Sequence, residues 1–470
     1  DGDVLVLTLS SKYSDISSTQ IRNYIDEDRD ISSLVDPMSQ QYIYENGFYQ
    51  RESQDKSLIK SPWLDIEIIE DFNEDILNKL CSCTLKVNDF FKNKLKDIAL
   101  KPYARIVLLK NTNNNEILGF SIFHWIPSST LYNEFKNSEV SQYIRENSVG
   151  RIILIDGIFI KNIYKYKEFE QILLTETLSL CVSKDYEYAL YKNFFSNNTV
   201  SEEIYTPLRL HGFVKVPFSD NNNPVYAVNM SAPCVLNLDI QNIIKEPFIS
   251  DPKVKHILSL SRRKLQEAIT KLYPGELILS YDANFMHQSM IRKICNENNV
   301  PTETLVPKTL GSAMCVPYGD ILDRYIIPNT VTKALHTEKL FNPDMKNFRI
   351  AEFPHYLDLK TQVKMINSFS RPVILVDNLL HKGYRIKALD PIFKNENVKG
   401  QKIVVGVLSG KGKDIMDMQN RDVDTIHFIP RLKLWFNENS LYPFIGGDAI
   451  WRGSYPERNL LPSINLILPY

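Results

Sequence analysis

The sequence predicts an α/β protein of three units, at residues 1–55, 63–232 and 250–470. Short apolar runs of strand length alternate with stretches of helical periodicity along the chain, which is typical of this class. The length of 470 residues corresponds to about three domains of roughly 150 residues each. Polar or proline-containing segments at 52–62 and 231–250 mark the two boundaries.

The composition is that of an ordinary globular protein. The 55 basic and 56 acidic side chains leave a net charge of −1, so neither nucleic acid nor a membrane surface is expected as a partner. There is no signal-peptide pattern and no apolar run of about 18 residues, which predicts a cytoplasmic location. The six cysteines show no CxxC spacing, and Cys81 and Cys83 lie in an expected helix, so reduced, buried thiols are expected.

In the first unit, an apolar strand at 4–9 precedes Ser17-Ser18-Thr19 and a helix at 21–24 that contains Arg22. Hydroxyls at a helix N-terminus with a cation one turn later can hold a phosphate, and a plain helix cap explains the hydroxyls equally well. The motif Ile16-Ser-Ser-Thr-x-x-Arg22, followed by 35–49 (VDPMSQQYIYENGFY), resembles the C-terminal tail of nicotinate-nucleotide adenylyltransferases, which are cytidylyltransferase-like nucleotidyltransferases. Ser39 stands where that family has valine.

This resemblance implies that residues 1–55 are the C-terminal part of a Rossmann-like nucleotidyltransferase domain, with Ser17, Ser18, Thr19 and Arg22 on a nucleotide phosphate. None of the eight histidines forms the paired motif with which that family binds its triphosphate. We therefore expect the rest of the domain to come from an upstream segment or a second chain, and we expect no nucleotide transfer by this chain alone.

The middle unit alternates helices and strands. The expected elements are helix 74–95, strand 104–110, strand 117–125, helix 131–146, strand 151–160, helix 167–184, strand 188–191, helix 202–210, strand 213–217 and strand 225–230. The asparagines at 112–115 predict a tight turn, because Asn tolerates positive φ. The element order, with 116–120 (EILGF), 154–160 (LIDGIFI) and 208–213 (LRLHGF), resembles the GNAT N-acetyltransferases over residues 63–232.

That resemblance implies acyl transfer, but the chain departs from the family at the cofactor loop. GNAT enzymes hold the pyrophosphate of acetyl-CoA on an R/Q-x-x-G-x-G/A loop, whereas residues 164–170 (YKYKEFE) contain no glycine and two acids. The sequence therefore predicts a structural or remodelled unit, with acetyl-CoA a doubtful cofactor. Asp156, Glu146 and His211 are candidate general bases, and solvated carboxylates or a helix-end histidine explain them as well.

In the third unit we expect helix 252–272, strand 276–280, helix 286–298, strand 402–408 and a buried strand that ends in Asp377 and leads through a glycine loop to helix 386–392. This strand–loop–helix resembles the ribose-phosphate motif of type I phosphoribosyltransferases. The resemblance implies a parallel sheet, a phosphoribosyl or nucleotide ligand and possible Mg²⁺ on a pyrophosphate. The implied ligand-binding residues are Asp377, Asn378, His381, Lys382, Gly383, Tyr384 and Arg385. An ordinary strand–turn–helix is the alternative.

Three weaker candidates complete the third unit. The loops Lys308–Ser312 and Ser409–Lys413 are possible anion sites, although neither has P-loop spacing. The aromatic C-terminal segment from Trp435 to Asp448 could form a lid, in which Trp435 would stack on a base. No metal ligand and no catalytic residue is assigned.

Together these observations predict a multidomain transferase-like protein of nucleotide or sugar-phosphate metabolism. The loss of family residues in each unit leaves two alternatives open. One is a non-catalytic protein that senses nucleotides or acts as a scaffold, and the other is an N-acyltransferase.

Overall fold

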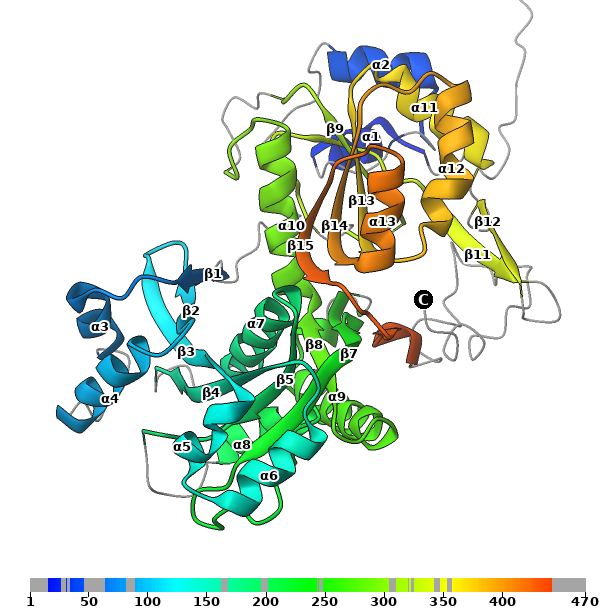
Figure 1. The fold of residues 1–470 in the computed structure, drawn as a ribbon. Coiled ribbons are helices and arrows are strands. Elements are labelled where there is room, and N and C mark those ends of the chain that lie inside the picture. Colours follow the sequence, from blue (N-terminus) through cyan, green and yellow to red (C-terminus); the bar gives the residue numbers. More distant parts are fainter. Residues whose placement is uncertain are drawn as a thin grey trace, which may run out of the picture.

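The structure, a computed structural model, describes residues 16–26, 31, 34–45, 64–81, 89–161, 168–195, 202–242, 244, 248–303, 310–319, 321–322, 325–341, 347–352 and 357–441. Within these residues the chain forms a nine-stranded mixed sheet, a five-stranded parallel sheet and a separate two-stranded antiparallel pair. The mixed sheet makes up the lower half of Figure 1 and the parallel sheet the upper half. The predicted α/β class is confirmed.

The mixed sheet is built mostly from the middle of the chain. Its strands are β1 (Leu64–Ile69), β2 (Arg105–Asn111), β3 (Glu116–Ile126), β4 (Arg151–Ile160), β5 (Tyr186–Tyr191), β6 (Val214–Lys215), β7 (Tyr226–Leu238), β8 (Glu276–Asp282) and β16 (Leu434–Asn437). Strands β1 to β4 pair antiparallel in chain order, and β4 and β5 then pair in parallel. The β4–β5 pairing ends at Ile155 and Tyr191, so the last residues of β4 pair with β3 alone.

Six helices accompany this part of the sheet: α3 (Glu74–Cys81), α4 (Asp89–Ala99), α5 (Leu131–Phe135), α6 (Ser138–Asn147), α7 (Phe169–Ser183) and α8 (Glu202–Leu210). The single helix expected at 131–146 is divided because Lys136 adopts a left-handed φ of 51° and Asn137 then caps α6. The helix expected at 74–95 is likewise two helices. Strand β1 was not expected at all. The turn predicted at the asparagines 112–115 is present, and Asn115 has the expected positive φ, 58°.

The segment at 231–250, expected as a linker, instead begins as the second half of β7. Pro233 suggested a break, but it lies where the β7–β8 register shifts between Asn229 and Cys234. A proline is tolerated at such an irregularity, and its carbonyl accepts a hydrogen bond from the Lys433 N–H. Strands β8 and β16, both assigned to the third unit from sequence, therefore pair with β7 in the mixed sheet.

The parallel sheet has the order β10 (Val331–Thr332), β9 (Met314–Pro317), β13 (Val373–Leu380), β14 (Gln401–Ser409) and β15 (Val423–Ile429). Its helices are α10 (Ala283–Glu297), α11 (Leu359–Ser368), α12 (Tyr384–Asn395) and α13 (Gly410–Met418), and α9 (Pro252–Leu272) packs beside β8. Helix α10 covers one face, and α11, α12 and α13 cover the other (Figure 1). Strands β11 (Thr337–Phe341) and β12 (Phe348–Glu352) form the separate pair beside α12.

The two sheets share one apolar core. Helix α7 contacts both β8 of the mixed sheet and β15 of the parallel sheet, and α10 contacts β8, β14 and β15. Side chains from both sheets belong to the same cluster of buried residues, among them Tyr281 and Val404. None of the side chains of α7 (169–183) is exposed, as is expected of a helix that is enclosed by other elements.

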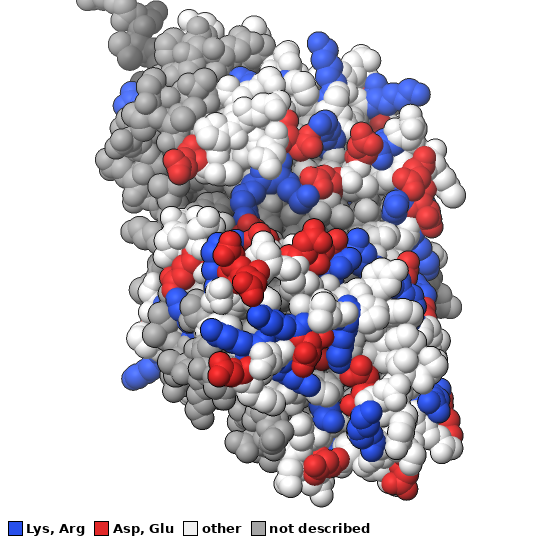
Figure 2. Space-filling view, turned by 60° about the vertical axis from the view of Figure 1, so that its left-hand side comes forward, with Lys and Arg blue, Asp and Glu red and all other residues white. Residues whose placement is uncertain are grey.

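Near the N-terminus the structure describes α1 (Ser18–Asp26) and α2 (Pro37–Glu45), and α2 packs against α11. The strand expected at 4–9 lies outside the described residues. The described cysteines are buried, as expected, and Cys83 lies outside the described residues. None of the helices in the described residues is long and apolar enough to cross a membrane. Figure 2 shows positive and negative side chains interspersed over one face of the molecule.

Candidate functional site

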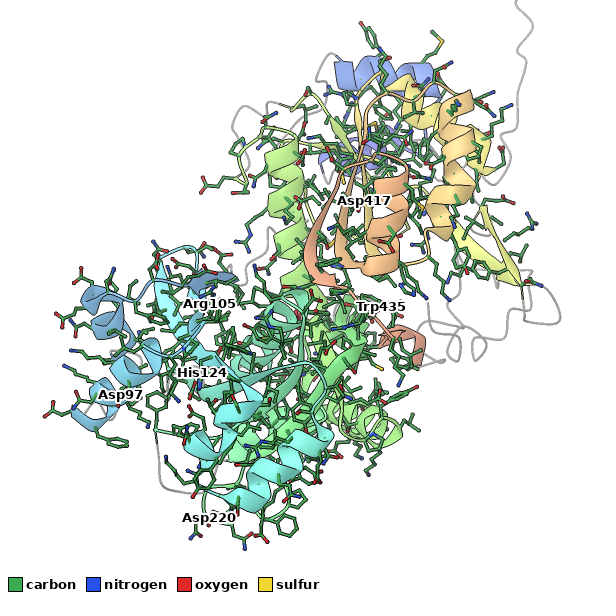
Figure 3. The ribbon with its side chains drawn as sticks, viewed as in Figure 1. Asp97, Arg105, His124, Asp220, Asp417 and Trp435 are labelled. Atoms are coloured by element: carbon green, nitrogen blue, oxygen red, sulfur yellow. The ribbon has the colours of Figure 1, made fainter. Side chains whose placement is uncertain are left out.

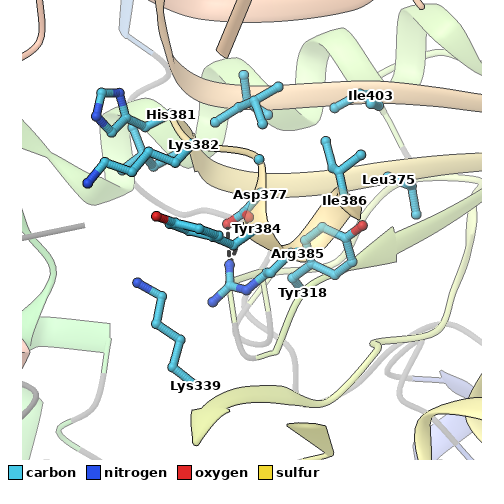
Figure 4. A pocket seen from close by; sticks show the side chains of 14 residues that line it. Tyr318, Lys339, Leu375, Asp377, His381, Lys382, Tyr384, Arg385, Ile386 and Ile403 are labelled. Carbon is cyan, nitrogen blue, oxygen red and sulfur yellow. Dashed lines mark hydrogen bonds and ion pairs between the residues drawn. The ribbon is translucent and has the colours of Figure 1, made fainter. Parts of the chain in front are cut away.

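A pocket lies where β13 leaves the parallel sheet and enters α12 (Figure 4). The space among its walls is about 590 Å³, open solvent at the mouth included. The wall residues are Tyr318, Lys339, Leu375, Asp377, Leu379, Leu380, His381, Lys382, Gly383, Tyr384, Arg385, Ile386, Ile403 and Val405. The pocket thus contains six of the seven residues implied by the phosphoribosyltransferase resemblance.

The exception is Asn378, which faces away from the pocket. The sequence suggested that the strand ends at Asp377, but β13 continues to Leu380, and successive side chains of a strand point to opposite faces. Asp377 therefore faces the pocket, whereas the Asn378 side chain accepts a hydrogen bond from His287 Nε2 of α10 at 3.1 Å. The two residues do not form one ribose-binding pair in this structure.

Asp377 is paired with Arg385, which lies in the first turn of α12. Arg385 Nη1 donates to both carboxylate oxygens at 2.7 Å, and both side chains are largely buried. The guanidinium also lies 5.7 Å from the centre of the Tyr318 ring. The Tyr318 hydroxyl is buried and has no hydrogen-bond partner among the described residues. A buried polar group without a partner is costly, so the pocket wall offers a hydroxyl that a ligand can satisfy.

Two lysines add further positive charge. Lys382 lies in the loop between β13 and α12, and Lys339 reaches the pocket from β11 (Figure 4). Burial, reinforced by Arg385, lowers the pKa of Lys339 to about 7. Burial, together with Lys382 and Lys411, also lowers the pKa of His381, whose Nδ1 lies 2.7 Å from Ser409 Oγ.

The loop itself is fixed by a glycine. Gly383 adopts a left-handed φ of 62° at the N-cap of α12, and no side chain caps this helix. The first turn of α12 lines the pocket, so its N–H groups and the positive end of the helix dipole lie at the wall. Glycine is favoured here because other residues pay a steric cost at positive φ.

Tyr318 and Lys339 were missed in the sequence because they precede the start of β13 by 55 and 34 positions. No spacing rule connects β9 or β11 with the β13 loop. Only the tertiary fold brings these two side chains to the pocket.

The described residues form a complete binding site for neither Mg²⁺ nor acetyl-CoA. No group of three metal-ligating side chains is present among them, and the carboxylate of the pocket is engaged by Arg385. A magnesium ion would thus depend on ligand phosphates. Residues 164–167 of the loop that would hold acetyl-CoA, 164–170, lie outside the described residues. Its two acids, Glu168 and Glu170, are described, and Glu170 is buried.

The remaining sequence candidates lie apart from this pocket. Ser17 caps α1 by accepting a hydrogen bond from the Gln20 N–H at 3.1 Å, and Ser18, Thr19 and Arg22 are exposed on the first turns. Residues 409–413 form the cap and first turn of α13 instead of a loop. Lys308 and most of the C-terminal segment lie outside the described residues.

Trp435 is placed in the core instead of a lid. It is only 2% exposed in β16, and its indole N–H donates to Asn437 Oδ1 at 3.1 Å. Figure 3 shows the residue at the junction of the two sheets. A ring packed in this way has no free face for a nucleotide base.

A second cluster of polar side chains lies inside the mixed sheet (His124 in Figure 3). His124 of β3 and Asp156 of β4 are both buried, and His124 Nδ1 lies 2.7 Å from Asp156 Oδ2. On the other side, His124 Nε2 lies 3.4 Å from Lys101 Nζ, which donates to Glu134 at 2.7 Å. Burial opposes charge on His124, but its hydrogen bonds with Asp156 and Glu134 outweigh burial and raise its pKa.

The candidate bases named from sequence have different environments. Asp156 is fully buried, so it is not a solvated strand-edge carboxylate, and burial raises its pKa. Glu146 is exposed on α6 and accepts a hydrogen bond from Gln142. His211 is buried at the end of α8, bonded to Thr175 and the Pro207 carbonyl, and burial lowers its pKa to about 4. The sequence signal for His124 was its place as the one ionisable residue of the expected strand 117–125.

No protein-family model and no curated protein sequence matches this chain. Solved structures of N-acyltransferases resemble about a third of it. FeeM, an N-acyl amino acid synthase from uncultured soil microbes, is 13% identical over 36% of this chain and 92% of its own (TM-score 0.27). An N-acetyltransferase from Staphylococcus aureus Mu50 is 12% identical over 35% and 97% (0.24). The ribosomal-protein-S18-alanine N-acetyltransferase from Escherichia coli is 8% identical over 35% and 94% (0.25).

Proposed function

We propose that the α12 pocket binds a phosphorylated sugar or a nucleotide, as expected of a transferase-like protein of nucleotide or sugar-phosphate metabolism. The proposal rests on the convergence of Lys339, Lys382 and Arg385 on a pocket in which Asp377 is the one acidic wall residue described. The surplus positive charge favours an anion, and phosphate forms strong charge-assisted hydrogen bonds with such side chains.

Two further features favour a sugar phosphate over a simple anion. The Asp377 carboxylate can accept hydrogen bonds from sugar hydroxyls, and the buried Tyr318 hydroxyl lacks a partner. Apolar wall residues such as Leu375, Ile386 and Val405 complete the pocket and exclude water from these contacts.

Thermal unfolding in the presence of small ligands tests this proposal. Ribose 5-phosphate and phosphoribosyl pyrophosphate should raise the melting temperature, because a ligand at 100 times its dissociation constant stabilises the folded state by about 2.7 kcal/mol. Ribose and sulfate are the matched controls. If sulfate raises the melting temperature as much as the phosphorylated sugars do, the pocket is only an anion site. If no phosphorylated sugar raises the melting temperature, the proposal is refuted. Binding without turnover would favour the sensing alternative.

A second candidate function is N-acyl transfer by the mixed-sheet part of the chain. It is favoured by the observed order β2 to β7, which follows the order on which the GNAT resemblance was based, and by the buried pair His124–Asp156. In such a reaction a base removes a proton from an amine as its nitrogen attacks a thioester carbonyl, and the thiolate leaves. The Lys101–Glu134 ion pair lies next to His124 Nε2, so His124 would serve as the base only after these two side chains separate.

This candidate predicts release of free thiol from acetyl-CoA in the presence of amines. His124→Gln should abolish the release, and Glu146→Gln, an exposed change on α6, should leave it unchanged. If the parent chain releases no thiol with any amine of a broad panel, the acyl-transfer candidate fails without affecting the α12 pocket.

A further inference from the structure

Three lysines surround one aromatic ring on the mixed sheet, apart from the α12 pocket. Lys94 belongs to α4, Lys101 follows α4, and Lys192 follows β5. Their Nζ atoms lie 5.4, 5.5 and 5.1 Å from the centre of the Phe194 ring. Two segments that are far apart in the sequence, 94–101 and 192–194, therefore place like charges at one point.

The acidic groups around these lysines compensate them only in part. Lys101 pairs with Glu134, whereas no described carboxylate forms an ion pair with Lys94 or Lys192. Glu134 and Asp220 are the acids that act on Lys192 from a distance. Burial and the nearby Lys94 outweigh this attraction and lower the pKa of Lys192.

Hydrogen bonds to β4 fix the segment that carries Lys192 and Phe194. The Lys192 N–H donates to the Ile155 carbonyl and the Phe194 N–H to the Asp156 carbonyl, both at 3.2 Å. Lys101 in turn contacts His124. The lysines therefore stand beside the buried His124–Asp156 pair, in which Asp156 Oδ1 has no hydrogen-bond partner among the described residues.

We propose that Lys94, Lys101 and Lys192 form a second ligand site, which binds the carboxylate or phosphate group of a small organic anion. An anion among the three ammonium groups relieves their mutual repulsion, and the Phe194 ring contacts the apolar part of the ligand. The binding is independent of the α12 pocket. The role of this ligand as the acyl acceptor next to His124 rests on the second candidate function.

Amine-reactive labelling of the full chain, read out by mass spectrometry residue by residue, tests the site. Inorganic phosphate and malonate are the two probes, and sodium chloride of equal ionic strength is the reference. Each probe that binds should slow the labelling of Lys94 and Lys192, while Lys92 and Lys96, exposed on the same helix α4, should label as before. Protection by one probe alone identifies the group that the site accepts.

Substitutions sharpen the test. Lys94→Met removes one charge-assisted contact and should raise the probe concentration for half-protection of Lys192 by roughly tenfold. Lys96→Met, the matched change on the same helix, should leave it unaltered. The proposal is overturned if neither probe protects beyond the chloride reference, or if Lys92 and Lys96 are protected equally. Protection without thiol release from acetyl-CoA retains the site and rejects only its role as acceptor site.

Discussion

At the scale of single residues, Lys339 makes the charge of the α12 pocket sensitive to pH. Its ammonium group lies in a buried position near Arg385, and both effects favour the neutral amine, which lowers its pKa to about 7. The lysine is therefore charged below this value and neutral above it. Anion binding should respond in the physiological range, where an ordinary lysine does not titrate.

We predict that sulfate affinity falls as the pH rises from 6 to 8. Sulfate is a suitable probe because its charge is constant there, whereas a phosphate monoester titrates near pH 6. Losing one charge-assisted contact should cost roughly tenfold in affinity. Lys339→Arg keeps the charge and should abolish the dependence, and Lys387→Arg, exposed on α12, should preserve it. Calorimetric titration of sulfate at three pH values measures this dependence. If the affinity of Lys339→Arg still falls with rising pH, Lys339 is excluded as the source of the dependence.

At the scale of elements, α7 brings a buried acid against the parallel sheet. Glu176 Oε1 lies 3.5 Å from His427 Nε2 of β15, and both side chains are largely buried. Burial raises the pKa of Glu176 to about 8 and lowers that of His427 to about 3. Between pH 4.5 and 8 the folded state holds the Glu176 proton more tightly than the unfolded state, so this residue makes stability fall with rising pH. His427 has the opposite effect between pH 3 and 6.5.

Of these two residues, only Glu176 titrates between pH 6.5 and 8, where it lowers the free energy of unfolding as the pH rises. Lys339, with a pKa of about 7, raises that free energy above pH 7, so the effect of Glu176 is measured as a difference between variants. Relative to the parent, Glu176→Gln should make the free energy of unfolding decrease less, or increase more, over this interval, since an amide does not titrate. Urea unfolding at both ends of the interval measures the effect, with the exposed change Glu139→Gln as control. The same pH dependence in Glu176→Gln and in Glu139→Gln would exclude Glu176 as a source.

Helix α13 approaches the end of β13 so closely that a side chain is excluded. A Cβ on Gly412 would lie nearer to the Leu380 carbonyl oxygen than carbon atoms approach in proteins. Gly412→Ala should therefore destabilise the chain by about 1–3 kcal/mol through backbone displacement. Lys413→Ala, at the exposed next position, should stay within about 0.5 kcal/mol of the parent. Similar unfolding midpoints for the two variants would show that α13 moves without cost.

The elements also show what the sequence could predict. Strand β13 and its glycine turn were recognisable because four consecutive apolar residues indicate a strand buried on both faces. The sequence did not show that the strand continues through Asp377 and Asn378, which directs the two side chains to opposite faces. Strand β7 was cut short at Pro233, because a proline signals a break unless the register irregularity that tolerates it is known.

At the scale of the whole molecule, the sharing of one core between the sheets has a thermodynamic consequence. Strand β16 comes from the C-terminal part of the chain and pairs with β7, and α7 and α10 contact both sheets. We predict that the two sheets unfold together in one calorimetric transition, with equal calorimetric and van't Hoff enthalpies. Two resolved transitions would instead support the separate units suggested by the sequence.

For the site, as for the elements, features that depend on neighbouring residues were predictable, whereas features that depend on tertiary contacts were not. The residues of the β13–α12 loop were predictable because they are consecutive. The partners from β9 and β11, and the pair of His124 with Asp156 across β3 and β4, depend on the fold. Trp435 was wrongly predicted to lie in a lid, because the sequence does not distinguish an aromatic residue of a lid from one of a buried strand.

The most direct test of the account is a calorimetric titration of ribose 5-phosphate into the parent chain and into Lys382→Met, with Lys387→Met as the matched control on exposed α12 surface. We predict saturable binding to the parent and the control. Binding to Lys382→Met should be weaker by about tenfold or more, because the variant lacks one charge-assisted phosphate contact. Equal affinity of all three chains, or no binding by the parent, would contradict the assignment of the α12 pocket as a sugar-phosphate site.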